Sequence, residues 1–218
     1  MKKNMLRVID NFLDDPYLFR NTGLKLYNEN KFVSTNCRWP GYRVEFPDSL
    51  LSKYIPKLAT LGMIPTVESA EDNKLHCRTN FQWVDETWVS GMWHDDSSDY
   101  TVLTFLNQDA PSNTGIEIGE NTITSRTGSD CVEYMEEDNC IIKDSFYRSS
   151  RNYYQRYLFK KKLDKYNSSP YFKDPCVVSN KFNRTVIFEK CQLHRAQNFF
   201  GKGKNARFTL ISFCNVTT

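Results

Sequence analysis

A histidine and an aspartate two residues apart, His94 and Asp96, stand just before the clearest strand pattern in the chain. That pattern is YTVLTFLN at residues 100–107, which is rich in β-branched, aromatic and aliphatic side chains. In an extended segment, side chains two residues apart point to the same side. His94 and Asp96 can therefore offer a nitrogen and an oxygen to one metal ion, which requires a fold that brings further ligands to the same strand end.

A third ligand is available in His194, which also lies in strand-like sequence. Two histidines and one carboxylate on one side of a metal, with the other positions open, form the facial triad of non-haem Fe(II) oxygenases. We therefore predict a metal site made of His94, Asp96 and His194. Two rivals remain at this point. Asp95 could replace Asp96, and His76, the only other histidine in the sequence, could be a ligand, although a structural or substrate-facing role is favoured.

Arg207 opens the last strand pattern, RFTLISF. An arginine presents a planar fork that can hold a carboxylate through two hydrogen bonds. If the co-substrate is 2-oxoglutarate, Arg207 is suited to hold its carboxylate that lies far from the metal. Thr209, two residues further on, would face the same way and could donate a hydrogen bond. Tyr100 could also hydrogen-bond the co-substrate, or it could be an aromatic residue of the core.

Helices are predicted near the start of the chain and strands after them. One helix is expected at about 16–28, where an aspartate can cap a first turn that holds Pro16. A second is expected at about 49–61, with a kink or break at Pro56, and 30–47 reads as a loop. Strand patterns occur at residues 6–9, 75–84, 100–107, 114–119, 184–188 and 207–213. This order favours an α+β layout, a β-sandwich or open barrel supported by N-terminal helices.

The length of 218 residues suits one domain with a large insertion. The polar interval at about 120–177 is that insertion. Within it, residues 151–162 mix cations with tyrosines and are predicted to be helical. This run could suit an anionic or nucleic-acid substrate, but a solvated helix face is favoured.

Composition excludes several classes of protein. The 29 basic and 26 acidic side chains leave a net charge of +3, which does not indicate a dedicated nucleic-acid binder. Apolar runs fall far short of the ~18–20 residues that cross a bilayer. The seven cysteines form no C-x-x-C pair, so we expect free thiols and a cytoplasmic protein, in the host cell if the chain is viral.

Several segments together resemble a known family. Residues 91–107, GMWHDDSSDYTVLTFLN, resemble the prolyl-4-hydroxylase-like branch of the 2-oxoglutarate/Fe(II)-dependent oxygenases, in which H-x-D precedes a strand that ends in Leu-Asn. Further similarities lie at residues 115–118 (the G-G-E-L strand), 186–196 (the strand and turn that hold the last histidine) and 207–210 (the basic position). The chain departs from the family in the long interval after Glu117 and in Thr114, which replaces the first glycine. Lys204 stands where many prolyl hydroxylases carry a lysine, so it rivals Arg207 as the anchor.

The resemblance implies a mainly β fold, a double-stranded β-helix (jelly roll). It assigns residues 1–73 to helical support, 74–119 and 178–218 to the jelly-roll core, and 120–177 to an insertion or lid. It also implies that His94, Asp96 and His194 bind iron and that Arg207 anchors 2-oxoglutarate.

The function implied is a dioxygenase that couples oxidative decarboxylation of 2-oxoglutarate to succinate with hydroxylation of a substrate. Its cofactors would be Fe(II), 2-oxoglutarate and O2, with ascorbate as a stimulant. Its partner would be a small molecule or a prolyl, other peptidyl or amino-acid side chain, and neither a membrane nor nucleic acid. Two alternatives stay open: a non-enzymatic β-sandwich binding module, and a cupin-like metalloenzyme that does not use 2-oxoglutarate.

Overall fold

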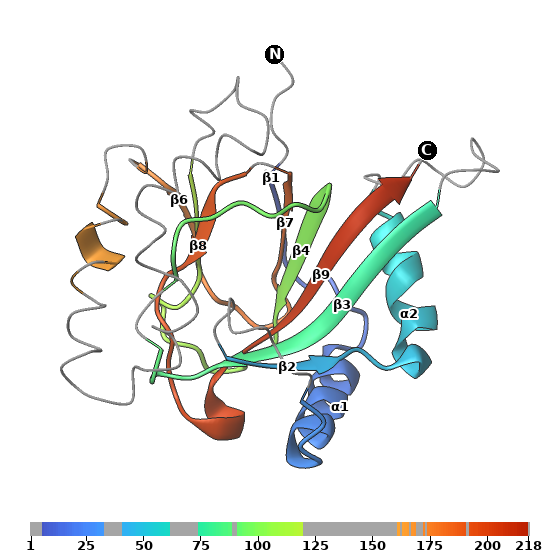
Figure 1. Ribbon diagram of the computed structural model, residues 1–218. Helices are drawn as coiled ribbons and strands as arrows, with labels where there is room; N and C mark the ends of the chain where they lie inside the picture. Colours follow the sequence, from blue (N-terminus) through green and yellow to red (C-terminus); the bar gives the residue numbers. More distant parts are fainter. Residues whose placement is uncertain are drawn as a thin grey trace.

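Two antiparallel sheets face each other, and two helices cover the outer side of the larger one (Figure 1). The structure is a computed structural model. It describes residues 6–32, 41–61, 74–88, 91–119, 174–190 and 192–217, together with 161, 163–165, 167, 168 and 172. The arrangement is the double-stranded β-helix that the sequence predicts, mainly β with few helices.

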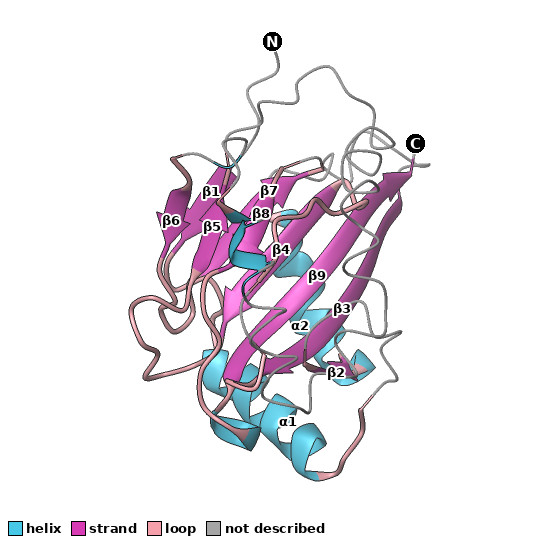
Figure 2. Ribbon diagram, turned by 60° about the vertical axis from the view of Figure 1, so that its left-hand side comes forward, coloured by secondary structure: helices cyan, strands magenta, loops and turns pink. Residues whose placement is uncertain are grey.

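The larger sheet has six strands and the smaller sheet has three, with every neighbouring pair antiparallel. In spatial order the larger sheet contains β1 (Leu6–Ile9), β7 (Thr185–Glu189), β4 (Tyr100–Phe105), β9 (Arg207–Thr217), β3 (Lys74–Val84) and β2 (Tyr42–Glu45). The smaller sheet contains β6 (Cys176–Val178), β5 (Ile116–Ile118) and β8 (His194–Ala196). Figure 2 shows the long strands β9 and β3 side by side.

Two predictions about strands need correction. Residues 42–45 were expected to be a loop, but they form β2, and all four of them pair with residues of β3. The strand is only four residues long and lies at the sheet edge, too short for a clear alternating pattern. Residues 176 and 177, placed in the insertion, belong to β6. Most of the predicted insertion and its helix at 151–162 lie outside the described residues, so the domain boundaries stay a prediction.

Both N-terminal helices form where expected. In α1 (Pro16–Asn28), Pro16 occupies the first turn and the Asp15 side chain accepts a hydrogen bond of 3.0 Å from the Leu18 amide. The second helix, α2 (Asp48–Ala59), runs through Pro56 without the predicted break, with that proline on its exposed side. In the part of the chain that the structure describes, no helix has the length and apolar character to cross a bilayer.

The alternation of side chains along each strand creates two cores. On the outer side of the larger sheet, Phe208 and Leu210 of β9 join the core beneath the helices. On the inner side, Ile211 of the same strand joins a second core between the two sheets. Because Arg207 and Thr209 share the parity of Ile211, they also face the space between the sheets. Side chains that face this space are therefore the candidates for a site.

Candidate metal centre

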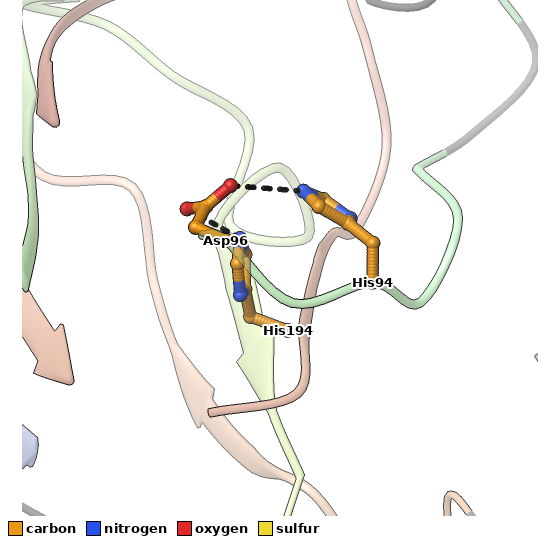
Figure 3. Close-up of side chains that lie close together, drawn as sticks. All are labelled: His94, Asp96 and His194. Carbon is orange, nitrogen blue, oxygen red and sulfur yellow. Dashed lines mark ion pairs between the residues drawn. The ribbon is translucent and has the colours of Figure 1, made fainter. Parts of the chain in front are cut away.

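The structure brings together the three residues predicted to be metal ligands (Figure 3). The His94 Nε2 atom lies 4.0 Å from Oδ1 of Asp96, and the His194 Nε2 atom lies 3.4 Å from Oδ2 of Asp96. One ligand atom from each residue lies within 4.8 Å of the others. Atoms that each lie ~2.0–2.2 Å from one metal ion are themselves a few ångströms apart, as the three ligand atoms of this cluster are. The three side chains can therefore hold a single ion.

Backbone pairing holds the two histidines together. The amide of His94 donates to the carbonyl of His194 (3.1 Å), and the amide of His194 donates back to the carbonyl of His94 (2.9 Å). Three residues earlier, the Gly91 amide donates to the carbonyl of Ala196 (3.2 Å). A Cβ atom at Gly91 would lie 2.4 Å from that carbonyl oxygen, so glycine permits this close approach.

Both imidazole rings are fixed in the tautomer that a metal needs. The Nδ1 atom of His94 lies 2.8 Å from the carbonyl oxygen of Met92, and Nδ1 of His194 lies 2.9 Å from that of Gln192. Because a carbonyl oxygen can only accept, Nδ1 carries the proton in each ring. Each Nε2 atom therefore keeps its lone pair for a metal, as in well-supported metal sites.

The buried surroundings of His194 keep its imidazole neutral. Burial lowers the pKa of its imidazole to about 4, the neighbouring His94 lowers it as well, and the Asp96 carboxylate partly offsets both effects. Neutral imidazole is the form that binds metals. The side chains of Asp96 and His194 are 7% and 6% exposed, whereas that of His94 is 24% exposed. Solvent therefore reaches the triad from the side of His94.

The structure selects Asp96 over its neighbour Asp95. Thr101, the second residue of β4, donates a hydrogen bond of 2.6 Å from its hydroxyl to Oδ2 of Asp96. Asp95 lies outside the cluster of ligand atoms, and burial raises the pKa of its carboxyl group. Sequence reasoning missed the role of Thr101. The available signal was a hydroxyl side chain at the start of the strand that follows the H-x-D pair, five residues after Asp96.

Arg207 and Thr209 form a second polar group on the inner side of β9. Arg207 is 3% exposed, and its Nε atom donates to the carbonyl of Thr114 (3.2 Å). The Nη2 atom of Arg207 and the Thr209 hydroxyl are buried without a hydrogen-bond partner among the described residues. The rings of Phe105 and Phe199 have their centres 5.5 and 5.9 Å from the guanidinium carbon and hold it in place. Burial lowers the pKa of Arg207 to about 10, so it remains a cation at neutral pH.

Strand β5 relates this arginine to the triad. Arg207 reaches the carbonyl of Thr114 just before β5, and His194 is the register partner of Ile118 at the far end of β5. The triad and Arg207 therefore face the space between the sheets from opposite ends of one short strand. Lys204, the rival anchor, is exposed in the 3-10 turn η3 (Gly203–Asn205).

Tyr100 and His76 do not join the site. Tyr100 packs against the core beneath the helices, on the side of β4 opposite to Thr101. The interpretation of Tyr100 as a co-substrate contact is therefore not supported, and the alternative of a core aromatic residue describes it. His76 is exposed on β3 and lies outside the cluster of ligand atoms.

The sequence matches no protein-family model and no curated protein, but solved structures match nearly the whole chain. The non-haem α-ketoglutarate-dependent carbocyclase SnoK from nogalamycin biosynthesis is 11% identical, with a TM-score of 0.58 over 99% of this chain and 82% of that one. The epimerase SnoN in complex with Fe3+, α-ketoglutarate and nogalamycin RO is 12% identical, with a TM-score of 0.57 over 98% and 80%. A prolyl hydroxylase from Trichoplax adhaerens in complex with a hypoxia inducible factor peptide fragment is 12% identical, with a TM-score of 0.52 over 96% and 83%.

These comparisons agree with the site. The chain shares the double-stranded β-helix fold of these proteins, and its H-x-D…H pattern brings His94, Asp96 and His194 into one cluster that could hold a metal ion. The resemblance predicted from the sequence is confirmed at the level of fold and triad.

Proposed function

We propose that the chain is an Fe(II)- and 2-oxoglutarate-dependent dioxygenase that hydroxylates a small-molecule or peptidyl substrate. The observation that carries this proposal is the buried guanidinium of Arg207, which has no acidic partner among the described residues and a free Nη2 atom. The Thr209 hydroxyl, on the same side of β9, is also buried without a hydrogen-bond partner among them. A buried cation without an anion is costly. A dicarboxylate co-substrate would supply that anion from the direction of the triad.

The residues present fit both groups. His94, Asp96 and His194 would hold Fe(II), and Arg207 with Thr209 would hold the carboxylate of 2-oxoglutarate that lies far from the metal. When bound, Fe(II), 2-oxoglutarate and O2 supply the oxidative decarboxylation that yields succinate and the hydroxylation of the substrate.

The chain itself contributes orientation and a dry environment. The carbonyls behind the two imidazoles fix their tautomers, and the hydroxyl of Thr101 fixes the carboxylate of Asp96. The core between the sheets, which includes Leu103 and Ile211, places apolar side chains between the triad and Arg207. Such surroundings exclude water from a reactive centre.

A prolyl, other peptidyl or amino-acid side chain is the substrate class that we propose. Support comes from the Trichoplax adhaerens prolyl hydroxylase, which was solved with a peptide fragment. The fold also occurs in the carbocyclase SnoK and the epimerase SnoN, so the fold alone does not select a peptide.

Succinate formation tests the proposal. Purified protein is loaded anaerobically with Fe(II), mixed with 2-oxoglutarate and ascorbate, and exposed to O2. We expect succinate that depends on Fe(II) and 2-oxoglutarate, that ascorbate increases, and that His94→Ala abolishes. His76→Ala is the matched control and should keep the activity.

Two results would favour one of the alternatives instead. If the purified protein binds no metal, it is a binding module of the β-sandwich type. Bound metal without the weak visible charge-transfer band on addition of 2-oxoglutarate would indicate a cupin-like enzyme that does not use this co-substrate.

A further inference from the structure

A buried asparagine, Asn180, has no hydrogen-bond partner for its side chain among the described residues. Asn180 is 7% exposed, and both polar atoms of its amide, Oδ1 and Nδ2, are buried and unpaired. Buried polar groups in native structures nearly always have partners, because an unpaired one costs free energy. The Nη2 atom of Arg207 and the hydroxyl of Thr209 are unpaired in the same way. The position of Asn180 relative to these two residues is therefore informative.

The register of the smaller sheet locates Asn180. Ile116 of β5 pairs with Val178 of β6, and the two segments stay together beyond this pair. A Cβ atom at Gly115 would lie 2.9 Å from the Cα atom of Ser179, so these two residues are still adjacent. The next position of the same antiparallel register brings Asn180 opposite residue 114.

Asn180 and Arg207 approach the same stretch of backbone. The carbonyl of Thr114, the residue opposite Asn180, accepts the 3.2 Å hydrogen bond from Nε of Arg207. Val178 belongs to the core between the sheets, and Asn180 lies two residues further on. Side chains two residues apart in an extended segment share a side, so Asn180 faces the space between the sheets. Its amide and the guanidinium therefore border the same part of that space.

The connection from β6 to β7 crosses this end of the space between the sheets. It leads from the smaller sheet to the larger one, and the amide of Asn183 within it donates to the carbonyl of Phe105 (2.9 Å). The centre of the Phe105 ring lies 5.5 Å from the guanidinium carbon of Arg207. Thr209 is the register partner of Phe105. The unpaired atoms of Asn180, Arg207 and Thr209 are therefore gathered at one end of the space.

We infer that Asn180 is a further residue of the co-substrate site, whose Nδ2 atom donates a hydrogen bond to the carboxylate of 2-oxoglutarate that Arg207 holds. The two oxygens of a carboxylate accept several hydrogen bonds, so a guanidinium, a hydroxyl and an amide can share them. The Oδ1 atom can accept from a guanidinium N–H, so both polar atoms of the amide find partners. The inference rests on the proposed function, because the ligand is its co-substrate.

Two 2-oxo acids isolate this contact. 2-Oxoglutarate and 2-oxopentanoate share the keto acid end, but only 2-oxoglutarate has the second carboxylate. Each is titrated by anaerobic calorimetry into protein loaded with Mn(II). We expect Asn180→Ala to raise the Kd of 2-oxoglutarate by at least about tenfold, since a hydrogen bond to a charged group is lost. The Kd of 2-oxopentanoate should not change.

Melting temperatures separate a binding role from a structural one. Because the Asn180 amide is unpaired in the ligand-free protein, Asn180→Ala should not lower the melting temperature of that form. Saturating 2-oxoglutarate should raise the melting temperature less in this variant than in the wild type. Asn180→Asp keeps the shape of the side chain but sets a negative charge beside the carboxylate, so it should weaken 2-oxoglutarate binding more than alanine does.

A matched control removes an asparagine from another part of the molecule. Asn21 is exposed on α1, which covers the outer side of the larger sheet, and Asn21→Ala should leave the Kd of 2-oxoglutarate unchanged. Unchanged affinity in Asn180→Ala would overturn the inference, and the amide would then hold a buried water. An equal loss of affinity for both 2-oxo acids, or a lower melting temperature of the ligand-free variant, would overturn it by assigning Asn180 a structural role.

Failure of the proposed function would appear separately. If the wild-type protein binds no Mn(II) or no 2-oxoglutarate, the oxygenase proposal fails, and glutarate decides the inference about Asn180 alone. Glutarate has two carboxylates but no keto group, and it is titrated by calorimetry into metal-free protein. Binding that both Asn180→Ala and Arg207→Gln weaken would show that this end of the space holds a carboxylate. Absence of glutarate binding would overturn the inference in that case.

Discussion

The Nε2 atom of His194 faces the Oδ2 atom of Asp96 at 3.4 Å, although the two residues lie far apart in the sequence. The proton of His194 lies on its other nitrogen, which donates to the carbonyl of Gln192. Two electron-rich atoms therefore point at each other in a buried place. A cation between them would turn this unfavourable contact into two metal–ligand bonds.

The hydroxyl of Thr101 should control the affinity for metal through Asp96. Thr101→Val keeps the shape of the side chain but removes the 2.6 Å hydrogen bond that orients the carboxylate. Loss of such a supporting interaction typically weakens metal binding by about 10- to 100-fold. Calorimetry with Mn(II) measures the change. Thr101→Ser, which restores the hydroxyl, should recover most of the affinity, and equal affinity in the wild-type and valine proteins would refute this role.

Arg207 rather than Lys204 should determine the affinity for 2-oxoglutarate. Arg207→Gln removes a buried cation, and the lost charged hydrogen bond of ~2 kcal/mol corresponds to an increase of about 30-fold in Kd. Lys204 is exposed, so Lys204→Gln should change Kd by less than about twofold. Anaerobic titration of the Fe(II) protein, followed by its visible band, gives both values. The opposite ranking of the two variants would identify Lys204 as the anchor.

The metal-free protein should lose stability in mild acid because of His194. Its pKa is about 4 in the folded protein and about 6.5 in an unfolded chain. Between these values the unfolded chain binds a proton that the folded protein excludes. The contribution of His194 to the free energy of unfolding is therefore fully present above pH 6.5, and it decreases as the pH falls toward 4. The expected loss is roughly 3 kcal/mol.

Denaturant unfolding at several pH values measures this effect. The difference between the wild-type protein and His194→Ala should shrink as the pH falls through this window. In His76→Ala, which changes an exposed histidine, the dependence should match that of the wild type. A difference that does not vary with pH would show that His194 does not titrate in this way.

Cys77 and Cys214 should form a disulfide under mild oxidation. Both are free thiols and register partners on β3 and β9, with their sulfur atoms 2.8 Å apart. The neighbouring Cys214 lowers the pKa of Cys77, which favours the reactive thiolate. We expect diamide to join Cys77 to Cys214, which mass spectrometry of proteolytic peptides detects, and this disulfide to raise the free energy of unfolding by about 2–4 kcal/mol. In Cys77→Ser, the cross-linked peptide and the gain in stability should both be lost.

The sequence by itself determined the chemistry of the triad. The two-residue spacing of His94 and Asp96 before an apolar strand sets the direction of both side chains locally, so no distant information is needed. The strands β3, β4, β7 and β9 and both helices were likewise predictable, because alternation and capping are local patterns. The type of residue at position 207 also indicated its chemistry, since an arginine that opens an apolar strand is unusual.

Tertiary structure decided which residues meet. Only the pairing of β4 with β9 and β3 places Phe213 between Thr101 and Arg78, and only β2 brings Arg43 to the same place. Tyr100 is a second feature that only the tertiary structure decided. Strand alternation does not tell which side of β4 faces the helices and which faces the metal site. Local spacing fixes the relative direction of neighbouring side chains, whereas the contacts between strands depend on how the whole chain buries its apolar surface.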